Sequence, residues 1–375
     1  MKNLRIMLCG GGTGGHVLPL VAVARAIKKL NPTAKIYFVG PEEFSLNALR
    51  EEGVIVKTII AAGKIRRYFS FKNFWEIIKI PFAFIQSLIV VTSINPNVTL
   101  GKGSYGSVLP VLAADILFKK TIIHESDAIP GLANRFLSYV TDNVAISFEE
   151  ARKYFNNKNV YLTGNPIRTN FINLSKGEAS SVLDIQTDNP PSHKASEGQG
   201  KVIFISGGSQ GAQRINNAVL KALDSLLEKY FVIWSVGKNN FDSIKQKISN
   251  KDNIKLFDFL NEKEIASAYI LCDLAVGRAG AGTIFELAAF AKPSILIPLE
   301  RKGGDQPVNA FSYTKTGASF LLRERDLDNF KETLENILND DSKLDSMHEN
   351  AEKFGKIEAA DSLAKILLDL AKNES

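Results

Sequence analysis

Four glycine-rich loops, each directly after a short apolar run, set the strongest limit on how this chain folds. They are GGGTGGH at residues 10–16, GKGSYGS at 101–107, GGSQGA at 207–212 and GRAGAG at 277–282. Short apolar runs are typical of buried strands, and strands that alternate with helical patterns favour a parallel sheet covered on both faces. The second half of the chain repeats the pattern of the first. We therefore predict an α/β fold with two Rossmann-like, doubly wound parallel-sheet domains that face a cleft.

Length and composition agree with two domains. The chain has 375 residues, of which 45% are apolar, enough to fill two cores. We place an N-terminal domain at residues 1–163 and a C-terminal domain at 201–345. Residues 164–200 are the predicted linker, and within it 176–200 are polar and rich in Ser, Pro and Gly, as in a flexible insertion. Residues 346–375 are expected to form a C-terminal helix that packs back on the N-terminal domain.

The two cysteines and the N-terminus indicate a reducing compartment. Cys9 and Cys272 lie in separate apolar runs, which excludes a disulfide framework. The first nine residues are strand-like and have neither a long apolar core nor a cleavage site of small residues, so no signal peptide is expected. We expect the protein to stay in the cytoplasm.

Residues 277–310 have the features of a nucleotide site. The glycine loop is followed by a helical pattern from Thr283, and the free N–H groups of a first helical turn attract a phosphate. Glu286 lies about one turn inside this helix, where its carboxylate can accept two hydrogen bonds from a ribose diol. Alternatively, Glu286 only complements the helix dipole. An apolar strand at 294–298 and a polar loop at 300–306 then bring a second strand end to the same edge of the sheet.

The loop at residues 10–16 also matches G-x-G-x-x-G, the dinucleotide fingerprint. That match is weak, because the ribose-binding acid expected about 20 residues later is supplied only by Glu42 and Glu43, which come rather late. His16 ends the loop at the predicted helix start. It is either a partly exposed helix cap or a functional imidazole.

Residues 64–94 combine positive charge, aromatic side chains and an apolar run. Five basic residues against one acid give residues 64–79 a local charge of +4. Residues 80–94 are shorter than the roughly 20 residues that a span needs and contain Pro81, Gln86 and Ser87, so we expect no membrane span. An interfacial patch on an anionic membrane is favoured over an amphipathic helix with core aromatics, and nucleic acid is disfavoured. The residues expected to contact the membrane are Lys64, Arg66, Arg67, Phe71, Phe74 and Trp75.

Five motifs in order carry a family resemblance. GGGTGGH, HESDAIPGLANR at 124–135, GNPIR at 164–168, GGSQGA, and GRAGAGTIFELAAFAKP at 277–293 resemble the bacterial lipid II-forming N-acetylglucosaminyltransferases, the MurG family. The resemblance implies a GT-B fold, UDP-GlcNAc as donor and lipid I, the undecaprenyl-pyrophosphoryl-MurNAc-pentapeptide, as acceptor. It further implies inversion at the anomeric carbon, a β-1,4 link, no cofactor, and a peripheral position on the cytoplasmic face of the cell membrane. The N-terminal domain would then hold the acceptor and the C-terminal domain the UDP-sugar.

The resemblance also implies roles for individual residues. Thr13, Gly14 and Gly15 would lie at the donor sugar and phosphates, with Asp127 nearby. Arg168 and Ser209 would contact the nucleotide phosphates, and Leu260 the uracil. The diphosphate and ribose would lie against a run of six residues at the start of the helical pattern at 281–286, and Gln306 would contact the GlcNAc hydroxyls. That run is Ala281, Gly282, Thr283, Ile284, Phe285 and Glu286.

Three motifs depart from the family pattern. The family commonly has HEQN where this chain has His124-Glu125-Ser126-Asp127, two glutamines in place of Asp305-Gln306, and GGY in place of residues 103–105. The acceptor hydroxyl must lose a proton, and His16 is the best base by its residue type. Asp127 is the second candidate, although a carboxylate is a weak base for an alcohol.

The departing UDP needs stabilisation of its charge, which a metal or protein donors can supply. The only D-x-D, residues 326–328, lies away from every glycine loop, so we interpret it as helix capping and predict no metal. Helix N-termini, the amides of residues 207–211 and Arg168 would act instead. Two other functions remain open: a UDP-GlcNAc epimerase of the same fold, which has no need for the patch at 64–94, and a non-catalytic membrane-docking partner of another transferase.

Overall fold

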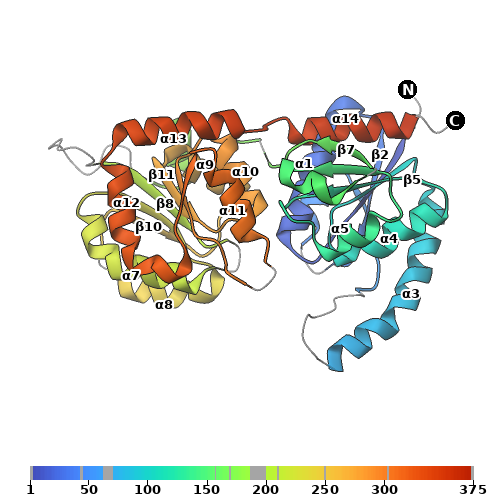
Figure 1. Ribbon diagram of the computed structural model, residues 1–375, viewed down its shortest axis with the longest axis horizontal. Helices are drawn as coiled ribbons and strands as arrows, with labels where there is room; N and C mark the ends of the chain where they lie inside the picture. The colour runs from blue at the N-terminus through green and yellow to red at the C-terminus, as the bar shows by residue number, and fades with distance from the viewer. Residues whose placement is uncertain are drawn as a thin grey trace. The chain divides into compact units, whose positions relative to one another are not determined.

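The computed structural model describes residues 3–42, 45–61, 71–156, 158–168, 170–185, 200–208, 211–248, 251–301 and 304–372, with the backbone alone at 71–75. The chain divides into two compact units. The first unit comprises Met1–Arg168 and Ile357–Ser375, and the second comprises Thr169–Lys356. Each unit is built around one sheet (Figure 1).

The first unit holds a seven-stranded, all-parallel sheet in the order β3-β2-β1-β4-β5-β6-β7. The strands are β1 Arg5–Cys9, β2 Lys35–Gly40, β3 Ile55–Thr58, β4 Val98–Gly101, β5 Lys120–Glu125, β6 Asn143–Ile146 and β7 Asn159–Leu162. The helices are α1 Gly14–Leu30, α2 Asn47–Glu51, α3 Phe71–Ile94, α4 Tyr105–Ile116, α5 Leu132–Leu137, the 3₁₀ turn η1 Glu149–Tyr154 and α14 Ala359–Lys372. Strands β1, β4 and β6 are buried almost throughout, because helices cover both faces of the sheet.

The last helix of the chain completes the core of the first unit. Helix α14 packs along α1, and its residues Leu363, Leu367 and Ala371 are buried together with Leu4 and Ile6 of the first strand region. Apolar side chains spaced by four along α14 thus form one face, which meets the helix that follows β1.

Helix α3 is longer than the apolar run suggests. Its residues Glu76–Ile94, 19 in all, are long and apolar enough to cross a membrane by length and composition, with 22% of the tested window buried. The prediction that this segment is too short to span a bilayer is therefore wrong on length, because the helix begins at Phe71. One face is packed within the unit, since Ala83, Ser87 and Val91 are fully buried and α3 contacts α4. Such a packed face is also found in core helices of soluble proteins.

The second unit holds a six-stranded, all-parallel sheet in the order β10-β9-β8-β11-β12-β13. Its strands are β8 Val202–Ser206, β9 Phe231–Ser235, β10 Ile254–Phe257, β11 Leu274–Gly277, β12 Ser294–Leu296 and β13 Ser319–Leu321. Its helices are α6 Lys176–Val182, α7 Gln213–Leu227, the 3₁₀ turn η2 Lys238–Asn240, α8 Phe241–Ile248, α9 Glu262–Leu271, α10 Ala281–Ala289, α11 Gln306–Thr314, the 3₁₀ turn η3 Glu324–Asn329, α12 Phe330–Leu338 and α13 Asp341–Phe354. The prediction of two doubly wound parallel-sheet domains is confirmed.

The segment between the sheets is partly helical. Residues 176–182, expected to belong to a flexible insertion, instead form α6, which begins with a capping box between Ser175 and Glu178 and packs against α9. Residues 186–199 lie outside the described part of the chain. The D-x-D at 326–328 lies in η3, and the residue that precedes α12 is Asn329.

Candidate functional site

In both units the glycine loops flank the point where the strand order reverses. From β1 the first chain segment runs outward to β2 and β3 and then returns to β4 on the other side of β1. The second unit repeats this at β8 and β11. Ligands of open α/β sheets bind at the carboxyl ends of strands at such a reversal. The loops at residues 10–13 and 102–104 therefore mark the site of the first unit, and the residues that follow β8 and β11, at 207–208 and 278–280, mark the site of the second.

Helix α1 brings the first group of predicted residues together. Thr13 is the N-cap residue, and its carbonyl accepts hydrogen bonds from His16 N and Val17 N at 3.1 and 3.2 Å. Gly14 and Gly15 are the first two helical residues. Gly12 has φ +88°, and a Cβ there would lie 3.0 Å from the Tyr105 ring. A side chain at residue 12 would therefore be strained as well as crowded, which explains the glycine.

The ring of His16 is oriented by the residue that follows β4, the strand beside β1 in the sheet. Its Nδ1 lies 3.1 Å from the carbonyl oxygen of Lys102, the first residue after β4. Because a carbonyl only accepts, Nδ1 carries the hydrogen, and in the neutral imidazole Nε2 then carries the lone pair. This is the tautomer that a base needs if Nε2 is to take a proton.

The side chain of Lys102 is buried among polar groups at the same strand edge. Its ammonium donates to His124 Nδ1 at 2.8 Å, to Asn165 Oδ1 at 3.1 Å and to the Ser126 hydroxyl oxygen. Only 1% of Lys102 is exposed. Burial lowers the pKa of Lys102 to about 8, although the nearby carboxylates of Glu125 and Asp127 act to raise it.

His124 and Glu125 stabilise the loop that carries Asp127. His124 Nε2 donates to the Gly164 carbonyl at 3.0 Å, and burial together with the Lys102 charge keeps the His124 pKa well below its usual value. The Glu125 carboxylate accepts from Asp127 N at 2.9 Å, Gly131 N at 3.1 Å and Asn134 Nδ2 at 2.9 Å. Burial raises the pKa of Glu125, and these three hydrogen bonds act against that rise. Asp127 is half-buried, on a loop whose backbone the Glu125 carboxylate holds by hydrogen bonds.

In the second unit, α10 presents its first turn at the reversal between β8 and β11. Gly280 is its N-cap residue, and Gly282 is exposed, with Thr283 and Glu286 half-exposed. Ile284 and Phe285 are buried, and the Phe285 ring lies 5.5 Å from that of Phe354. Of the predicted run at 281–286, Ile284 and Phe285 thus have side chains in the core, and the Ile284 N–H donates within the helix to the Gly280 carbonyl at 3.0 Å.

Glu286 and Arg278 have partners that the sequence did not indicate. The Tyr269 hydroxyl of α9 lies 3.5 Å from Glu286 Oε2, and its ring stacks on Phe290. Arg278, inside the glycine loop, forms an ion pair with the buried Glu324 at 2.6 Å and donates to the Ile297 carbonyl at 3.1 Å. Arg278 shares this carboxylate with Arg214, whose Nη1 lies 3.1 Å from Glu324 Oε2.

The remaining predicted residues lie at other places in the two units. Leu260 is buried in the segment between β10 and α9, next to the exposed Phe259. Gln306 is the first residue of α11, and its side-chain oxygen accepts from Leu299 N at 2.9 Å. Arg168 is the last residue of the first unit's main segment. Ser209, Lys64, Arg66 and Arg67 lie outside the described residues, as do the side chains of Phe71, Phe74 and Trp75.

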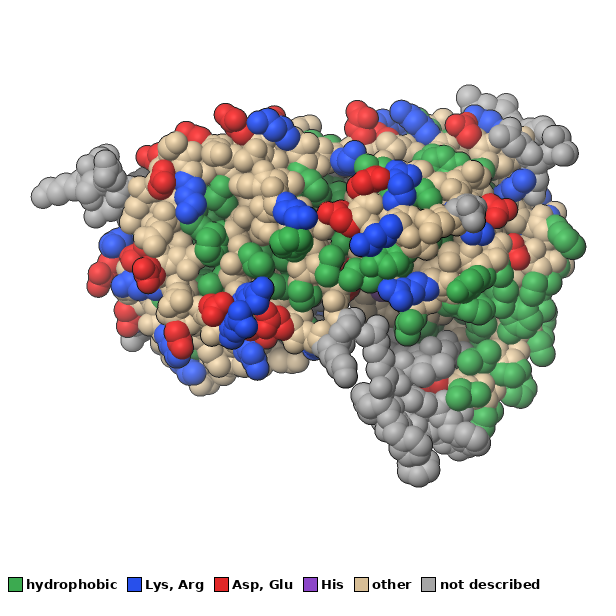
Figure 2. All heavy atoms as spheres, in the orientation of Figure 1, with side chains coloured by type: hydrophobic (Ala, Val, Ile, Leu, Met, Phe, Trp, Pro, Cys, Tyr) green, Lys and Arg blue, Asp and Glu red, His purple; other side chains and the backbone are tan. Residues whose placement is uncertain are grey.

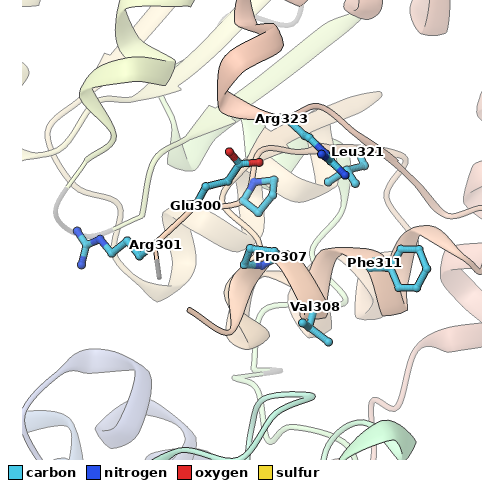
Figure 3. A pocket seen from close by; sticks show the side chains of 8 residues that line it. Glu300, Arg301, Pro307, Val308, Phe311, Leu321 and Arg323 are labelled. Carbon is cyan, nitrogen blue, oxygen red and sulfur yellow. The ribbon is translucent and has the colours of Figure 1, made fainter. Parts of the chain in front are cut away.

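A pocket of about 600 Å³ lies beside α11, and Pro307, Val308 and Phe311 of that helix line it (Figure 3). Its lining combines apolar side chains with two arginines and one carboxylate. It comprises Pro298, Glu300, Arg301, Pro307, Val308, Phe311, Leu321 and Arg323. No predicted site residue lines it. Across the described ranges, no group of three His, Cys, Asp or Glu side chains is placed to hold a metal ion.

The exposed side of α3 is apolar. Ile78, Phe82, Ile85 and Ile89 recur at helical spacing and are between 39% and 65% exposed; we call them the α3 apolar face. Figure 2 shows the green side chains gathered over this helix. Contiguous exposed apolar surface of this kind marks an interaction site.

Two doubly wound parallel sheets, with helix N-termini and glycine loops at both reversals, place the protein in the class of two-domain nucleotide-sugar enzymes with the GT-B fold. The glycosyltransferase family 28 N-terminal domain matches residues 6–146, and the family's C-terminal domain matches residues 202–364. This chain belongs to glycosyltransferase family 28.

The curated relatives are more specific. The UDP-N-acetylglucosamine--N-acetylmuramyl-(pentapeptide) pyrophosphoryl-undecaprenol N-acetylglucosamine transferase of Clostridium kluyveri is 36% identical over 97% of this chain and 98% of its own length. The protein of the same name from Clostridium perfringens strain 13 is 34% identical over 95% of both chains. The resemblance seen in the five motifs is confirmed.

Solved structures agree on the fold. The MurG of Acinetobacter baumannii superposes with a TM-score of 0.73 at 22% identity, over 98% of this chain and 99% of that one. The UDP-GlcNAc 2-epimerase of Neisseria meningitidis reaches 0.65 at 16% identity, over 98% and 100%. At these identities the likeness concerns the fold alone.

Proposed function

We propose that this protein transfers GlcNAc from UDP-GlcNAc to the C4 hydroxyl of MurNAc in lipid I, with inversion, to form lipid II in peptidoglycan synthesis. The observation that carries the proposal is 36% identity over 97% of the chain to a relative named for this transfer. An epimerase shares the fold at 16% identity, which gives that activity no comparable support. The first unit takes the acceptor, and the second takes the UDP-sugar.

His16 removes the proton from the attacking hydroxyl. The support for this role is its hydrogen bond from Nδ1 to the Lys102 carbonyl, which leaves the lone pair on Nε2. Asp127 accepts a hydrogen bond from a sugar hydroxyl. As the acceptor oxygen loses its proton to His16, it forms a bond to the anomeric carbon from the face opposite UDP, while the bond from that carbon to the UDP oxygen breaks and UDP leaves with the electron pair.

Charge that develops on UDP is stabilised by donors of the protein. These are the backbone N–H groups at the start of α10, the amides at residues 207–211 and Arg168. We propose that no metal ion takes part, so turnover in excess EDTA should equal turnover with added Mg²⁺. A loss with EDTA that Mg²⁺ restores would refute this part of the proposal.

The protein acts as a peripheral protein on the cytoplasmic face of the cell membrane. The α3 apolar face supports this, since exposed apolar side chains insert into the headgroup boundary, and the basic residues near 64–67 add attraction to anionic lipid.

Incubation with UDP-GlcNAc and a short-chain lipid I analogue, followed by mass spectrometry, tests the reaction. The expected product is the acceptor enlarged by one N-acetylhexosamine with a β-1,4 link. Epimerised UDP-sugar with an unchanged acceptor would establish the epimerase instead. If neither product forms although calorimetry shows that UDP-GlcNAc binds, both enzymatic functions are contradicted. The protein would then be a non-catalytic membrane-docking partner.

A further inference from the structure

The side chain of the buried lysine at the carboxyl end of β4 has no role in the reaction described so far. Lysine is almost never fully buried unless it is paired, and Lys102 is 1% exposed. It lies between the two groups to which we assign chemistry. Its carbonyl orients His16, and its ammonium lies beneath the loop of Ser126 and Asp127.

The three hydrogens of the ammonium are matched by three acceptors. His124 Nδ1 is an acceptor because His124 Nε2 donates to the Gly164 carbonyl at 3.0 Å. Asn165 supplies its amide oxygen at 3.1 Å. The third acceptor is the hydroxyl oxygen of Ser126, which must therefore direct its own hydrogen away from Lys102.

Ser126 is half-buried and lies between Glu125, whose carboxylate points into the protein, and Asp127. A serine hydroxyl rotates freely unless a neighbour fixes it. The ammonium of Lys102 removes that freedom.

We propose that Lys102 is a positioning residue that fixes Ser126 as a hydrogen-bond donor to a sugar oxygen of the substrates. Ser126 makes the contact, and Lys102 acts through it. This inference rests on the proposed transferase function. The sugar oxygen belongs either to the transferred GlcNAc or to the acceptor, and separate kinetics for each substrate identify which.

Loss of the Lys102 proton reverses the arrangement. The neutral amine has two hydrogens and a lone pair, so Ser126 turns its hydrogen inward to Lys102 and no longer donates to the sugar. The charged or titratable groups that face Lys102 are His124, Glu125 and Asp127. With the pKa of Lys102 at about 8, the donor is present at pH 7 and is lost above pH 8.

The test is a mutant cycle of Ser126→Ala, Lys102→Met and the double variant, with kcat/KM measured for donor and acceptor from pH 6 to 9.5. At pH 7, each single variant should lower kcat/KM for one substrate by about two- to hundredfold, the range for a lost hydrogen bond to a neutral or charged partner. The kcat/KM of the double variant should equal that of the less active single variant, because Lys102 acts through Ser126. The wild type should show a fall near pH 8 that Ser126→Ala lacks.

Two matched controls separate this role from a general effect on folding. Ser138→Ala removes a hydroxyl that donates to the Arg135 carbonyl at 2.8 Å, and Lys158→Met removes an ion pair with Asp142 at 3.3 Å. Both should leave the pH profile unchanged. Additive effects in the cycle, or a Ser126→Ala profile equal to that of the wild type, would overturn the proposal.

Thermal unfolding gives a second measurement that needs no activity. The folded pKa of Lys102 is below its unfolded value of 10.5, so between pH 8 and 10.5 the unfolded chain binds more protons and stability rises with pH. The Tm of the wild type should therefore rise relative to Lys102→Met across this window. A constant difference would refute a buried, titrating Lys102. A wild type without product would count against the transferase function alone.

Discussion

At the scale of single residues, Glu286 tests the donor site. Replacing it with alanine should weaken UDP-GlcNAc binding by about 1.5–3 kcal/mol, the range for a charge-assisted hydrogen bond, and change kcat less. The reason is its place one turn inside α10, where the Tyr269 hydroxyl lies 3.5 Å from the carboxylate. Calorimetry measures the dissociation constant, with Glu335→Ala, which removes a surface pair with Lys229, as control. A constant within twofold of the wild type would disprove the ribose contact.

His16 and Asp127 form a second pair at this scale. His16→Ala should lose about 10²–10⁴-fold in turnover, the range for removal of a general base. Asp127→Asn should keep most of the turnover, because the amide still binds a sugar hydroxyl. Turnover of both variants is measured from pH 5 to 9 with saturating donor. If Asp127→Asn collapses while His16→Ala is nearly unaffected, the two roles are reversed.

At the scale of elements, helix α3 is the part that we propose contacts the membrane. Phe82 is 64% exposed on the α3 apolar face, and burial of a Phe side chain contributes roughly 1.5–3 kcal/mol. Phe82→Ser should therefore weaken binding to anionic vesicles about tenfold or more at low and high salt. Reversal of Lys64, Arg66 and Arg67 to Glu should weaken it chiefly at low salt, where charges are less screened. Cosedimentation measures both.

The control for this element is Phe311→Ser, which removes a Phe that is 53% exposed in the second unit. Its vesicle binding should equal that of the wild type. If Phe82→Ser and the triple reversal also sediment like the wild type, α3 is an ordinary surface helix and its apolar face has another partner.

At the scale of the whole molecule, the end of the chain stabilises the unit that contains its beginning. Leu367 of α14 is fully buried in the core of the first unit, so Leu367→Ala should cost about 2–5 kcal/mol of unfolding free energy. In a Trp75→Phe background, Trp234 is the only tryptophan and reports on the second unit's core. The urea midpoint followed by circular dichroism should fall in Leu367→Ala, whereas the midpoint followed by Trp234 fluorescence should not change. An equal shift of both signals would contradict this assignment.

Local patterns in the sequence were sufficient for the two parallel sheets, the glycine loops at strand ends and the family. Apolar runs and glycine positions depend on neighbours within a few residues, so they can be read without the fold. The sequence also led to His16 and to Glu286 as candidates, because each lies in the first two turns of a helix that follows a glycine loop at a strand end.

Only the tertiary structure revealed the partners of these residues. Lys102 reaches His124, Ser126 and Asn165 across 22, 24 and 63 residues of sequence, and a lysine between two glycines is ordinarily expected in solvent. Tyr269 is 17 residues before Glu286, on another helix, and α14 is more than 300 residues from α1. Such contacts depend on which strands become neighbours at a sheet reversal, and that order is set by the packing of the whole unit and not by any local run of residues.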